Sequence, residues 1–545
     1  MKRWLLGILA FTLAWIQAFE CGPISYAYEE GVQTETQIGI QEQTDPNQFV
    51  SYPAGLGIIV PGILSIEESP SDEAIRFYGP DGSSIYIYSQ DIKETSAREY
   101  INYSNKQINN SRGSFRPVYE KDIKLSNGVR AVEFMYERDK IDNIENDKNA
   151  YFEINSIYPN ESRVLTFWLK TDSDNLEYYK SLLNDMASSA WVFEKAKADY
   201  AVSYEDKDID IKGENIRLKI GRQRMLWGIM HPHNLDGSDY TSNLKPFEEE
   251  MGRKFEFLMT YSDFEHDVNL DEVEDVYEDG RVIMLTWQPW TYIDKTQNEN
   301  LESESTVLIP EIIKGSYDEY IRKWARDIKS IGNPVFVRFA NEMNGDWDAW
   351  CAWYFGKDTE LYNEAWKHLW NIFKEEGADN ALFVWNPHDR SYPDFVWNNS
   401  HMYYPGDEYV DWVGLTGYNN GTSFNGDSWR EFGEIYYPLY NDYMKHYSEK
   451  PFMITEFSCN EDGGDKAKWI NDGFNEFANM PNIKIAVWFN QVDTKWQYNI
   501  DSSKRSYRAF QNSVNKNPHF SMKSVFELSE RKTTEDAIDL IWKNH

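Results

Sequence analysis

The chain has 545 residues and a formal net charge of −35, because 90 Asp and Glu outnumber 55 Lys and Arg. A single hydrophobic core seldom serves more than about 250–300 residues, so this length predicts more than one domain. The acidic balance and the lack of a basic stripe argue against nucleic acid as a partner and against docking on an anionic membrane. With only 3 Cys, a disulfide scaffold and a Cys-rich metal cluster are excluded as well.

The N-terminus has the pattern of a secretory signal peptide. Two basic residues precede an apolar run, Trp4–Phe19, whose 16 residues fall short of the roughly 20 needed to span a bilayer. Small side chains at and before Ala27 suit cleavage there, so we expect a signal peptide over residues 1–27 and a secreted or cell-surface protein. The polar stretch that follows, residues 28–48, predicts a flexible linker.

Residues 49–197 show the period-two alternation of half-buried strands, interrupted by turn signals such as Pro80-Asp81-Gly82. Two helical stretches, 96–108 and 176–190, are expected to cover one face of the resulting antiparallel sheet. This smaller N-terminal α+β domain loosely resembles the PsbP/Mog1-like domains, and it contains no catalytic constellation. We expect an accessory domain, a spacer or an interaction module that contacts the cell wall or a protein partner. The strand segments include Ile75–Tyr78, Ser84–Tyr88, Arg130–Tyr136 and Arg163–Leu169.

Residues 215–516 have a different pattern, in which short apolar runs alternate with longer amphipathic stretches. A short helical C-terminal tail is expected over residues 517–545. The stretch 321–331 carries apolar residues at helical spacing on one face. Eight strand–helix units in about 300 residues predict an α/β fold of the (β/α)8 TIM-barrel type. A doubly wound open sheet would need a Gly-rich phosphate loop after the first strand, and Trp227–His233 is not one. The predicted strands are Met225–Met230, Phe255–Thr260, Val282–Thr286, Val335–Phe339, Ala381–Trp385, Trp412–Thr416, Phe452–Thr455 and Lys484–Trp488.

Two of the predicted strands lead into a glutamate. Glu342 follows Val335–Phe339, and Glu456 follows Phe452–Thr455. The interval of 114 residues equals three βα units of 38 residues, the pitch expected between strands 4 and 7 of a barrel. Because catalytic groups gather at the C-terminal ends of barrel strands, both carboxylates are expected at one rim. Such a pair, one protonated and one ionised, is what glycoside hydrolysis requires.

Tryptophans also gather at the predicted strand ends. Sugar rings have apolar C–H faces that stack on aromatic rings, so a carbohydrate site would place such side chains at the rim. Two or three of them are expected to be packing residues instead. The seven are Trp287, Trp290, Trp347, Trp350, Trp353, Trp385 and Trp488.

Four motifs at strand ends of the second domain together resemble glycoside hydrolase family 26, in the clan of retaining barrel glycosidases. The most specific is the Glu-Met-Asn-Gly-x-Trp run within Arg338–Trp347. The others are Thr455-Glu456, the strand-6 segment Val413–Asn419 and the strand-8 segment Ala486–Asn490, in the same order along the chain.

Position by position, the resemblance implies that Glu342 is the general acid/base and Glu456 the nucleophile. It implies that Tyr418 hydrogen-bonds the nucleophile and that Asn341 contacts the 2-hydroxyl of the reacting sugar. The other expected substrate contacts are Trp347, Trp488, Arg338, Trp287, Trp385 and His388.

These features predict a secreted, retaining endo-β-glycanase that needs no metal and no cofactor and acts on β-1,4-mannan-type polysaccharide. The resembled mannanases usually carry His before the acid/base, whereas this chain carries Asn341, so mixed-linkage β-glucan and β-1,3-xylan are alternatives within the family. A protein that binds polysaccharide without cleaving it is the alternative of another class. Cys351 and Cys459 are compatible with a disulfide or with two free thiols. The sequence does not indicate an oligomeric state.

Overall fold

The computed structural model describes residues 47–67, 71–110, 115–158, 161–196, 204–213, 216–230, 240–291, 308–517, 519 and 526–528. The predicted signal peptide and nearly all of the predicted linker lie outside these residues. Phe49–His545 forms one compact unit. In the described part of the chain, no helix is both long and apolar enough to cross a bilayer.

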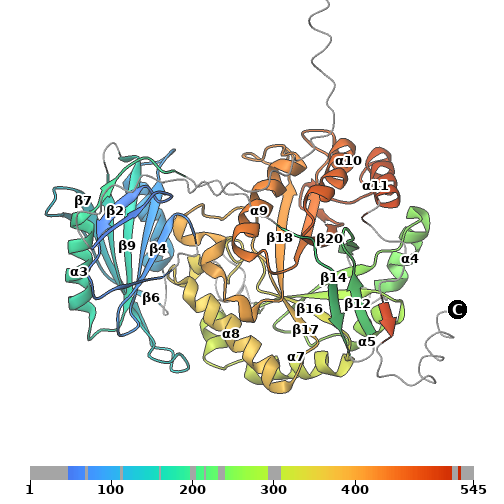
Figure 1. The fold of residues 1–545 in the computed structure, drawn as a ribbon, viewed down its shortest axis with the longest axis horizontal. Coiled ribbons are helices and arrows are strands. Elements are labelled where there is room, and N and C mark those ends of the chain that lie inside the picture. Colours follow the sequence, from blue (N-terminus) through green and yellow to red (C-terminus); the bar gives the residue numbers. More distant parts are fainter. Residues whose placement is uncertain are drawn as a thin grey trace, which may run out of the picture. The chain divides into compact units, whose positions relative to one another are not determined.

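The N-terminal domain is built on a seven-stranded antiparallel sheet in the order β3-β4-β5-β9-β8-β7-β6 (Figure 1). Side chains alternate between its faces, so in β9 Phe167 joins one hydrophobic cluster while Val164 and Trp168 join others. The strands are β3 (Ser65–Glu67), β4 (Ala74–Tyr78), β5 (Ser84–Asp91), β6 (Phe115–Lys124), β7 (Arg130–Arg138), β8 (Ala150–Ile157) and β9 (Arg163–Thr171).

The two predicted helical stretches of this domain meet opposite faces of the sheet. α3 (Leu176–Ser189) packs on the face that carries Phe167 (Figure 1). α1 (Ala97–Ser104) packs with Val132 and Val164, which project from the other face. The expectation that both helices cover one face is therefore wrong, because helical periodicity does not say which face a helix meets. The smaller elements are β1 (Gln48–Ser51), β2 (Leu56–Ile59), β10 (Trp191–Val192) and α2 (Lys106–Asn110).

The second domain is a closed barrel of eight parallel strands in chain order from β13 to β20, which confirms the predicted α/β barrel (Figure 1). In α7 (Asp318–Ile331), the predicted apolar stripe is buried, and Gly332 ends the helix in the left-handed conformation with φ 69°. The strands are β13 (Leu226–Met230), β14 (Phe257–Asp263), β15 (Val282–Gln288), β16 (Val335–Phe339), β17 (Ala381–Trp385), β18 (Trp412–Asn419), β19 (Phe452–Cys459) and β20 (Ile483–Phe489).

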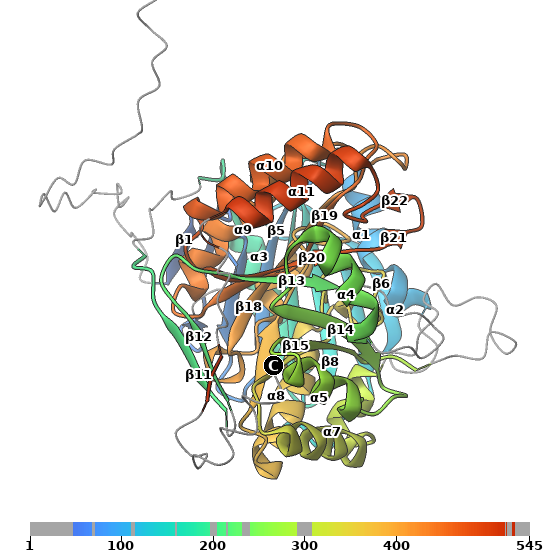
Figure 2. The same ribbon diagram turned by 90° about the vertical axis from the view of Figure 1, so that its right-hand side faces the viewer.

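The described helices of the barrel domain surround these strands, and α10 and α11 lie side by side in both views (Figures 1 and 2). The remaining α-helices are α4 (Tyr240–Met251), α5 (Leu270–Glu278), α6 (Ile309–Ile313), α8 (Thr359–Glu376), α9 (Phe432–Tyr447), α10 (Lys466–Glu476) and α11 (Lys504–Lys516). Short elements are the 3-10 turns η2 (Ala352–Tyr354), η3 (Val396–Asn398), η4 (Ser400–Tyr403), η5 (Asp407–Tyr409) and η6 (Phe477–Asn479), and the hairpin of β21 (Val492–Asp493) and β22 (Trp496–Gln497).

A small antiparallel sheet combines two strands that precede the barrel in the chain with one that follows it. β11 (Ile209–Lys212) pairs with β12 (Ile216–Ile220), and β23 (Phe526–Leu528) adds a third strand (Figure 2). Leu218 and Ile220 of β12 join the cluster of apolar side chains that fills the barrel interior. The expected helical tail is wrong for the described segment Phe526–Leu528, because strand pairing with β12 determines its conformation.

The N-terminal sheet and the barrel share one hydrophobic cluster. Tyr136, Tyr151 and Trp168 of the sheet belong to the same cluster as the helix-facing core of the barrel. The Tyr136 hydroxyl also donates to the carbonyl oxygen of Gly356, at 2.9 Å. The two parts of Phe49–His545 therefore pack as one body rather than as units joined only by a linker.

Buried ion pairs add to this interface. Lys170 of β9 lies 2.9 Å from a carboxylate oxygen of Asp358 and 2.8 Å from one of Glu360. Lys357 pairs with Glu153 of β8, and both side chains are almost fully buried. Lys357 and Asp358 end the segment that joins β16 to α8, and Glu360 lies in the first turn of α8, so the sheet holds the end of this segment in place.

Candidate active site

The two predicted catalytic glutamates lie at the C-terminal ends of β16 and β19, on the rim where barrel enzymes carry their chemistry. A β-bulge helps to aim Glu456. Ile454 and Phe457 are three residues apart in β19, but their partners in β20, Ala486 and Trp488, are two apart. The extra residue breaks the simple alternation between them, and bulges of this kind re-aim side chains near active sites.

Glu342 sits in a strained turn directly after β16. Ala340 and Glu342 have φ angles of 46° and 53°, in the left-handed region that costs a non-glycine residue on the order of 1–3 kcal/mol. Hydrogen bonds hold the turn: the Glu342 N–H donates to the Asn386 carbonyl at 2.7 Å, and the Trp350 indole donates to the Asn341 carbonyl at 2.6 Å. The surrounding structure therefore fixes the backbone that projects the Glu342 carboxyl group.

Three donors converge on the carboxylate of Glu456. Arg338 and Tyr261 both bond Oε1, and the Tyr418 hydroxyl donates to Oε2. Arg338 is fully buried, and its Nε donates to Asn386 Oδ1 at 2.6 Å. Although burial works against its charge, the Glu456 carboxylate keeps the pKa of Arg338 above its ordinary value. A buried cation and two hydroxyls therefore hold the Glu456 carboxylate in one orientation.

Glu342 has a different environment. Its Oε2 accepts one hydrogen bond, from the Trp347 indole at 3.1 Å, and its buried Oε1 has no hydrogen-bond partner among the described residues. Burial raises the pKa of Glu342, and the nearby negative charge of Glu456 raises it further, against the opposing effects of His388 and Arg338. The two carboxyl groups thus act on each other electrostatically, and Glu342 is the one that favours the protonated form.

An exposed aromatic wall stands beside Glu342. The Trp347 side chain is 46% exposed and Tyr392 is 41% exposed, and their ring centroids lie 5.3 Å apart. His388 meets Trp347 edge to face, with 5.0 Å between ring centroids. Gly345 allows this arrangement, since a Cβ atom there would come within 2.4 Å of the Trp347 ring. These rings offer the kind of surface on which a sugar stacks.

Several predicted substrate contacts lie elsewhere. Trp287, Trp385 and Trp488 are fully buried and pack against other side chains of the core, so they present no ring face to a sugar. For these three the prediction is wrong, because a position at a strand end does not say whether the side chain points into the mouth of the barrel or toward the helices. Trp350 and Trp353 are also nearly fully buried.

Arg338 and Asn341 belong to the site in different ways. Arg338 is fully buried beneath Glu456, so it positions the nucleophile, and the prediction that it contacts substrate is wrong. Asn341 is nearly buried beside Glu342, and its Oδ1 accepts from Gln288 at 3.4 Å. Contact of Asn341 and His388 with a sugar stays a prediction.

Tyr261 and Asn386 also belong to the site, although neither is among the predicted site residues. Tyr261 directly follows the predicted strand that ends at Thr260, and Asn386 directly follows the strand that ends at Trp385. Asn386 accepts from Arg338 and from Thr416, whose hydroxyl lies 3.1 Å away. A search of strand ends for every polar side chain, not only for carboxylates and indoles, would have found both.

The two cysteines of the described residues are free. Cys351 and Cys459 are both fully buried, and neither forms a disulfide. Burial raises the pKa of the Cys351 thiol to about 12. The thiols are therefore small packing groups rather than a covalent link between strands.

Comparisons with known proteins bear on the barrel. Residues 284–447, from β15 to the end of α9, match the family model of glycosyl hydrolase family 26. Endoglucanase H of Acetivibrio thermocellus is 32% identical over 282 residues, which are 50% of this chain and 29% of that protein. A mannan endo-1,4-beta-mannosidase of Bacillus subtilis is 33% identical over 137 residues, 24% of this chain and 35% of that protein. The chain thus spans about a third or less of these relatives' lengths.

Two further similarities complete the comparison. The beta-1,3-xylanase TXYA of a Vibrio species is 30% identical over 109 residues, 20% of this chain and 22% of that protein. The solved β-mannanase structure from Bacteroides ovatus is similar over 57% of this chain and 95% of that chain, with 15% identity and a TM-score of 0.41. On the matched family model and the related sequences, the barrel domain of this chain is similar to glycosyl hydrolase family 26.

Proposed function

We propose that the protein is a retaining endo-β-glycanase in which Glu342 is the general acid/base and Glu456 the nucleophile. The observation that carries the proposal is the contrast between the two carboxyl groups. Three donors surround Glu456, whereas Glu342 accepts one hydrogen bond and has a raised pKa. Hydrolysis by double displacement needs one ionised and one protonated carboxyl group on the same sugar.

In the first step, the Glu342 carboxyl group gives its proton to the bridging oxygen as the glycosidic bond breaks. The Glu456 carboxylate attacks the anomeric carbon from the opposite face and forms a glycosyl ester. Arg338, Tyr261 and Tyr418 are already aligned on Glu456, so they require little reorganisation at the moment of reaction. The aglycone half of the polysaccharide leaves with the proton from Glu342.

In the second step, Glu342 is a carboxylate and takes a proton from water. The water oxygen attacks the anomeric carbon, the ester bond breaks, and Glu456 recovers its negative charge. Two inversions at one carbon restore the original configuration. The donors on Glu456 stabilise it as a leaving group here, by the same contacts that hold it before the attack.

The test combines stereochemistry with a set of variants. Proton NMR during hydrolysis should show the β-anomer of the new reducing end before mutarotation. Glu342→Gln should lower the release of reducing ends by about 10²–10⁴-fold, and Glu456→Gln should reduce it to background. Glu375→Gln, on the exposed side of α8, is the matched control and should leave the rate unchanged. First appearance of the α-anomer would contradict the double displacement.

For the substrate, we favour a β-glucan backbone with β-1,4 linkages over β-mannan. Two observations support this choice: a match over half of this chain is to a protein named endoglucanase, and Asn341 precedes the acid/base. β-Mannan is the second candidate, supported by the shorter match to a mannan endo-1,4-beta-mannosidase. Mixed-linkage β-glucan, β-mannan and β-1,3-xylan, each offered at the same mass concentration, should give the highest kcat/KM for the glucan. A higher kcat/KM for mannan would contradict this choice and make β-mannan the preferred substrate.

A protein that binds polysaccharide without cleaving it is the rival of another class. It predicts that the wild type and both glutamine variants retain equal amounts of polysaccharide and release no reducing ends. The proposed enzyme predicts retained binding by the variants but turnover by the wild type alone. Affinity electrophoresis and reducing-end release on the same samples separate the two.

We also infer that the protein acts outside the cell and that its N-terminal domain contacts the cell wall or another protein. The N-terminal sequence pattern supports the first inference, and the absence of a catalytic constellation among its described residues supports the second. Fractionation of cells that express the full chain should recover the protein in the medium or at the cell surface. Mass spectrometry should find its N-terminus just after Ala27, and recovery of the uncleaved chain in the cytoplasm would contradict export.

A further inference from the structure

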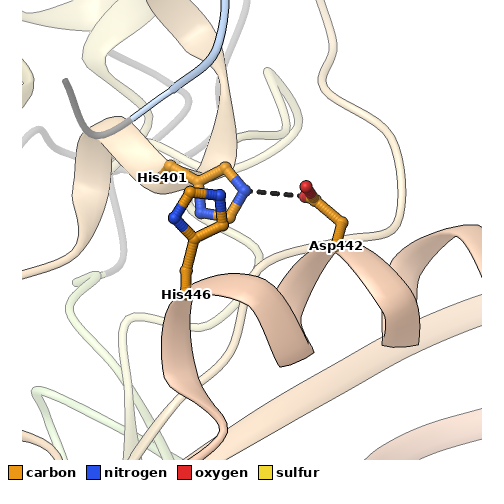
Figure 3. A group of neighbouring side chains, drawn as sticks. All are labelled: His401, Asp442 and His446. Atoms are coloured by element: carbon orange, nitrogen blue, oxygen red, sulfur yellow. Dashed lines mark hydrogen bonds and ion pairs between the residues drawn. The ribbon is translucent and has the colours of Figure 1, made fainter. Parts of the chain in front are cut away.

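Three side chains with metal-binding groups meet in the barrel domain (Figure 3). His401 comes from η4, in the connection between β17 and β18, and Asp442 and His446 come from α9. Asp442 and His446 are four residues apart, so one face of the helix presents both. One nitrogen of each ring and one carboxylate oxygen lie within 4.8 Å of one another. None of the three belongs to the catalytic machinery.

The buried member of the group is already oriented. His401 is only 4% exposed, and its Nε2 lies 2.7 Å from Asp442 Oδ2. Its Nδ1 lies 2.7 Å from the Tyr447 hydroxyl. A ligating histidine usually has its second ring nitrogen bonded to a neighbour, because that contact fixes the tautomer and the ring orientation. Tyr447 provides this contact and leaves Nε2 to face Asp442.

His446 completes the set from the exposed side. Its ring lies next to that of His401, with 4.5 Å between ring centroids (Figure 3). Two ligand atoms about 2 Å from a tetrahedral ion are roughly 3.3 Å apart. The present separations lie on both sides of that value, since His401 Nε2 is 2.7 Å from Asp442 Oδ2 and all three ligand atoms lie within 4.8 Å of one another. A cavity of about 720 Å³, lined among others by His401, His446 and Tyr404, gives an ion access and leaves room for water.

We propose that His401, Asp442 and His446 bind one Zn²⁺ ion, with a water molecule as the fourth ligand. Two imidazoles and one carboxylate are ligands that zinc prefers, whereas Mg²⁺ and Ca²⁺ prefer oxygen ligands alone. The ion would tie η4 to α9 and so fasten the connection after β17. That connection also carries Asn398, whose side-chain amide donates to the Asn344 carbonyl at 2.9 Å, next to the turn of the acid/base. The role is therefore structural, with Glu342 and Glu456 remaining free of metal.

An ordinary histidine–carboxylate pair elsewhere in the barrel domain provides the comparison. His368 Nε2 lies 2.7 Å from Asp318 Oδ1, but the pair is not part of a metal-ligand group of three among the described residues. It therefore resembles the His401–Asp442 contact without the third ligand. His368→Ala removes one half-buried imidazole that pairs with a carboxylate, and it serves as the control for His446→Ala.

The experiment uses the full-length protein without a histidine tag, freed of metal with a chelator and then dialysed. Isothermal titration with Zn²⁺ should show one equivalent bound by the wild type and by His368→Ala, with a rise of several degrees in Tm for both. His446→Ala and Asp442→Asn should lose at least tenfold in affinity and should lose the rise in Tm. Mg²⁺ at the same concentration should give neither heat nor stabilisation.

Three results would overturn the proposal. They are no binding of Zn²⁺ by the wild type, binding by His446→Ala as tight as that of the wild type, and an equal loss of affinity in His368→Ala. Circular dichroism of each metal-free variant checks that it is folded. If His446→Ala does not fold, the result for Asp442→Asn decides the test. Binding and Tm are measured without any substrate, so the outcome is independent of the proposed glycanase activity.

Discussion

Single residues around the two glutamates determine which carboxyl group holds a proton. The Trp347 indole donates to Glu342 Oε2, and this contact stabilises the ionised form. Burial and the charge of Glu456 act in the opposite direction and raise the pKa of Glu342. The first step needs Glu342 protonated, so activity should fall as the pH rises through this raised pKa. The descending limb of the pH profile therefore reports on Glu342.

Trp347→Phe should move that descending limb to higher pH. The substitution removes a donor to the carboxylate, so the protonated form of Glu342 persists to higher pH. The measurement is kcat/KM on a soluble polysaccharide between pH 4 and 10, with KM followed separately because the indole also borders the cleft. Tyr392→Phe, on the same exposed wall, should leave the limb in place. A limb that moves to lower pH in Trp347→Phe would contradict the assignment of Glu342 as the acid.

Tyr261→Phe should lower kcat by about 10–100-fold while the protein stays folded. The Tyr261 hydroxyl donates to the charged Oε1 of Glu456, and such a hydrogen bond contributes about 1.5–3 kcal/mol. Tyr418→Phe removes the donor to Oε2 and should act in the same direction. Single-turnover kinetics would assign the loss to the formation or breakdown of the ester. Wild-type kcat in both variants would show that these donors do not serve the nucleophile.

The sequence predicted these residues unevenly. Glu342, Glu456 and Tyr418 could be predicted because each follows or ends an apolar strand within a specific motif. Tyr261 was not, because a tyrosine after a strand is common and nothing local connects it to a glutamate 195 residues away. The direction of a side chain at a strand end depends on pleat and bulge, which explains the wrong prediction for Trp488.

At the scale of elements, all eight barrel strands could be predicted because each is an apolar run between amphipathic stretches. The turn after β16 could not. Left-handed φ angles at Ala340 and Glu342 have no signature in residue type, since neither is glycine. Hydrogen bonds from residues elsewhere in the chain hold these φ angles. One example is the Tyr362 hydroxyl, which donates to the Ala340 carbonyl at 3.1 Å.

Gly345→Ala tests how tightly this turn and the aromatic wall fit together. A methyl group at this position would come within 2.4 Å of the Trp347 ring, so the indole must leave its place over Glu342. We expect kcat/KM to fall by at least about tenfold, as for a group moved by about 1 Å, with little change in Tm. Gly221→Ala, where the nearest atom would be 3.6 Å away, is the control. Equal activity of the two variants would show that the position of Trp347 does not matter.

At the scale of the whole compact unit, the N-terminal sheet supports the segment that carries Trp347. Trp347 lies within the connection between β16 and α8, and Gly356, Lys357 and Asp358 end it. The sheet contacts all three of these last residues. The sequence predicts a separate accessory domain, because contacts between residues far apart in the chain produce no periodic pattern in the sequence. These contacts show that the N-terminal domain also stabilises the segment that ends at Asp358.

Lys170→Met tests this support. The substitution leaves Asp358, which is fully buried, without its nearest cation, and breaking a buried pair costs about 3–5 kcal/mol. Chemical denaturation should show this loss for Lys170→Met and almost none for Lys180→Met, whose partner Glu177 is largely exposed. Because the loosened segment leads back to Trp347, kcat/KM should fall in Lys170→Met at temperatures where the protein is still folded. Full activity together with the full loss of stability would mean that the sheet stabilises the barrel without positioning Trp347.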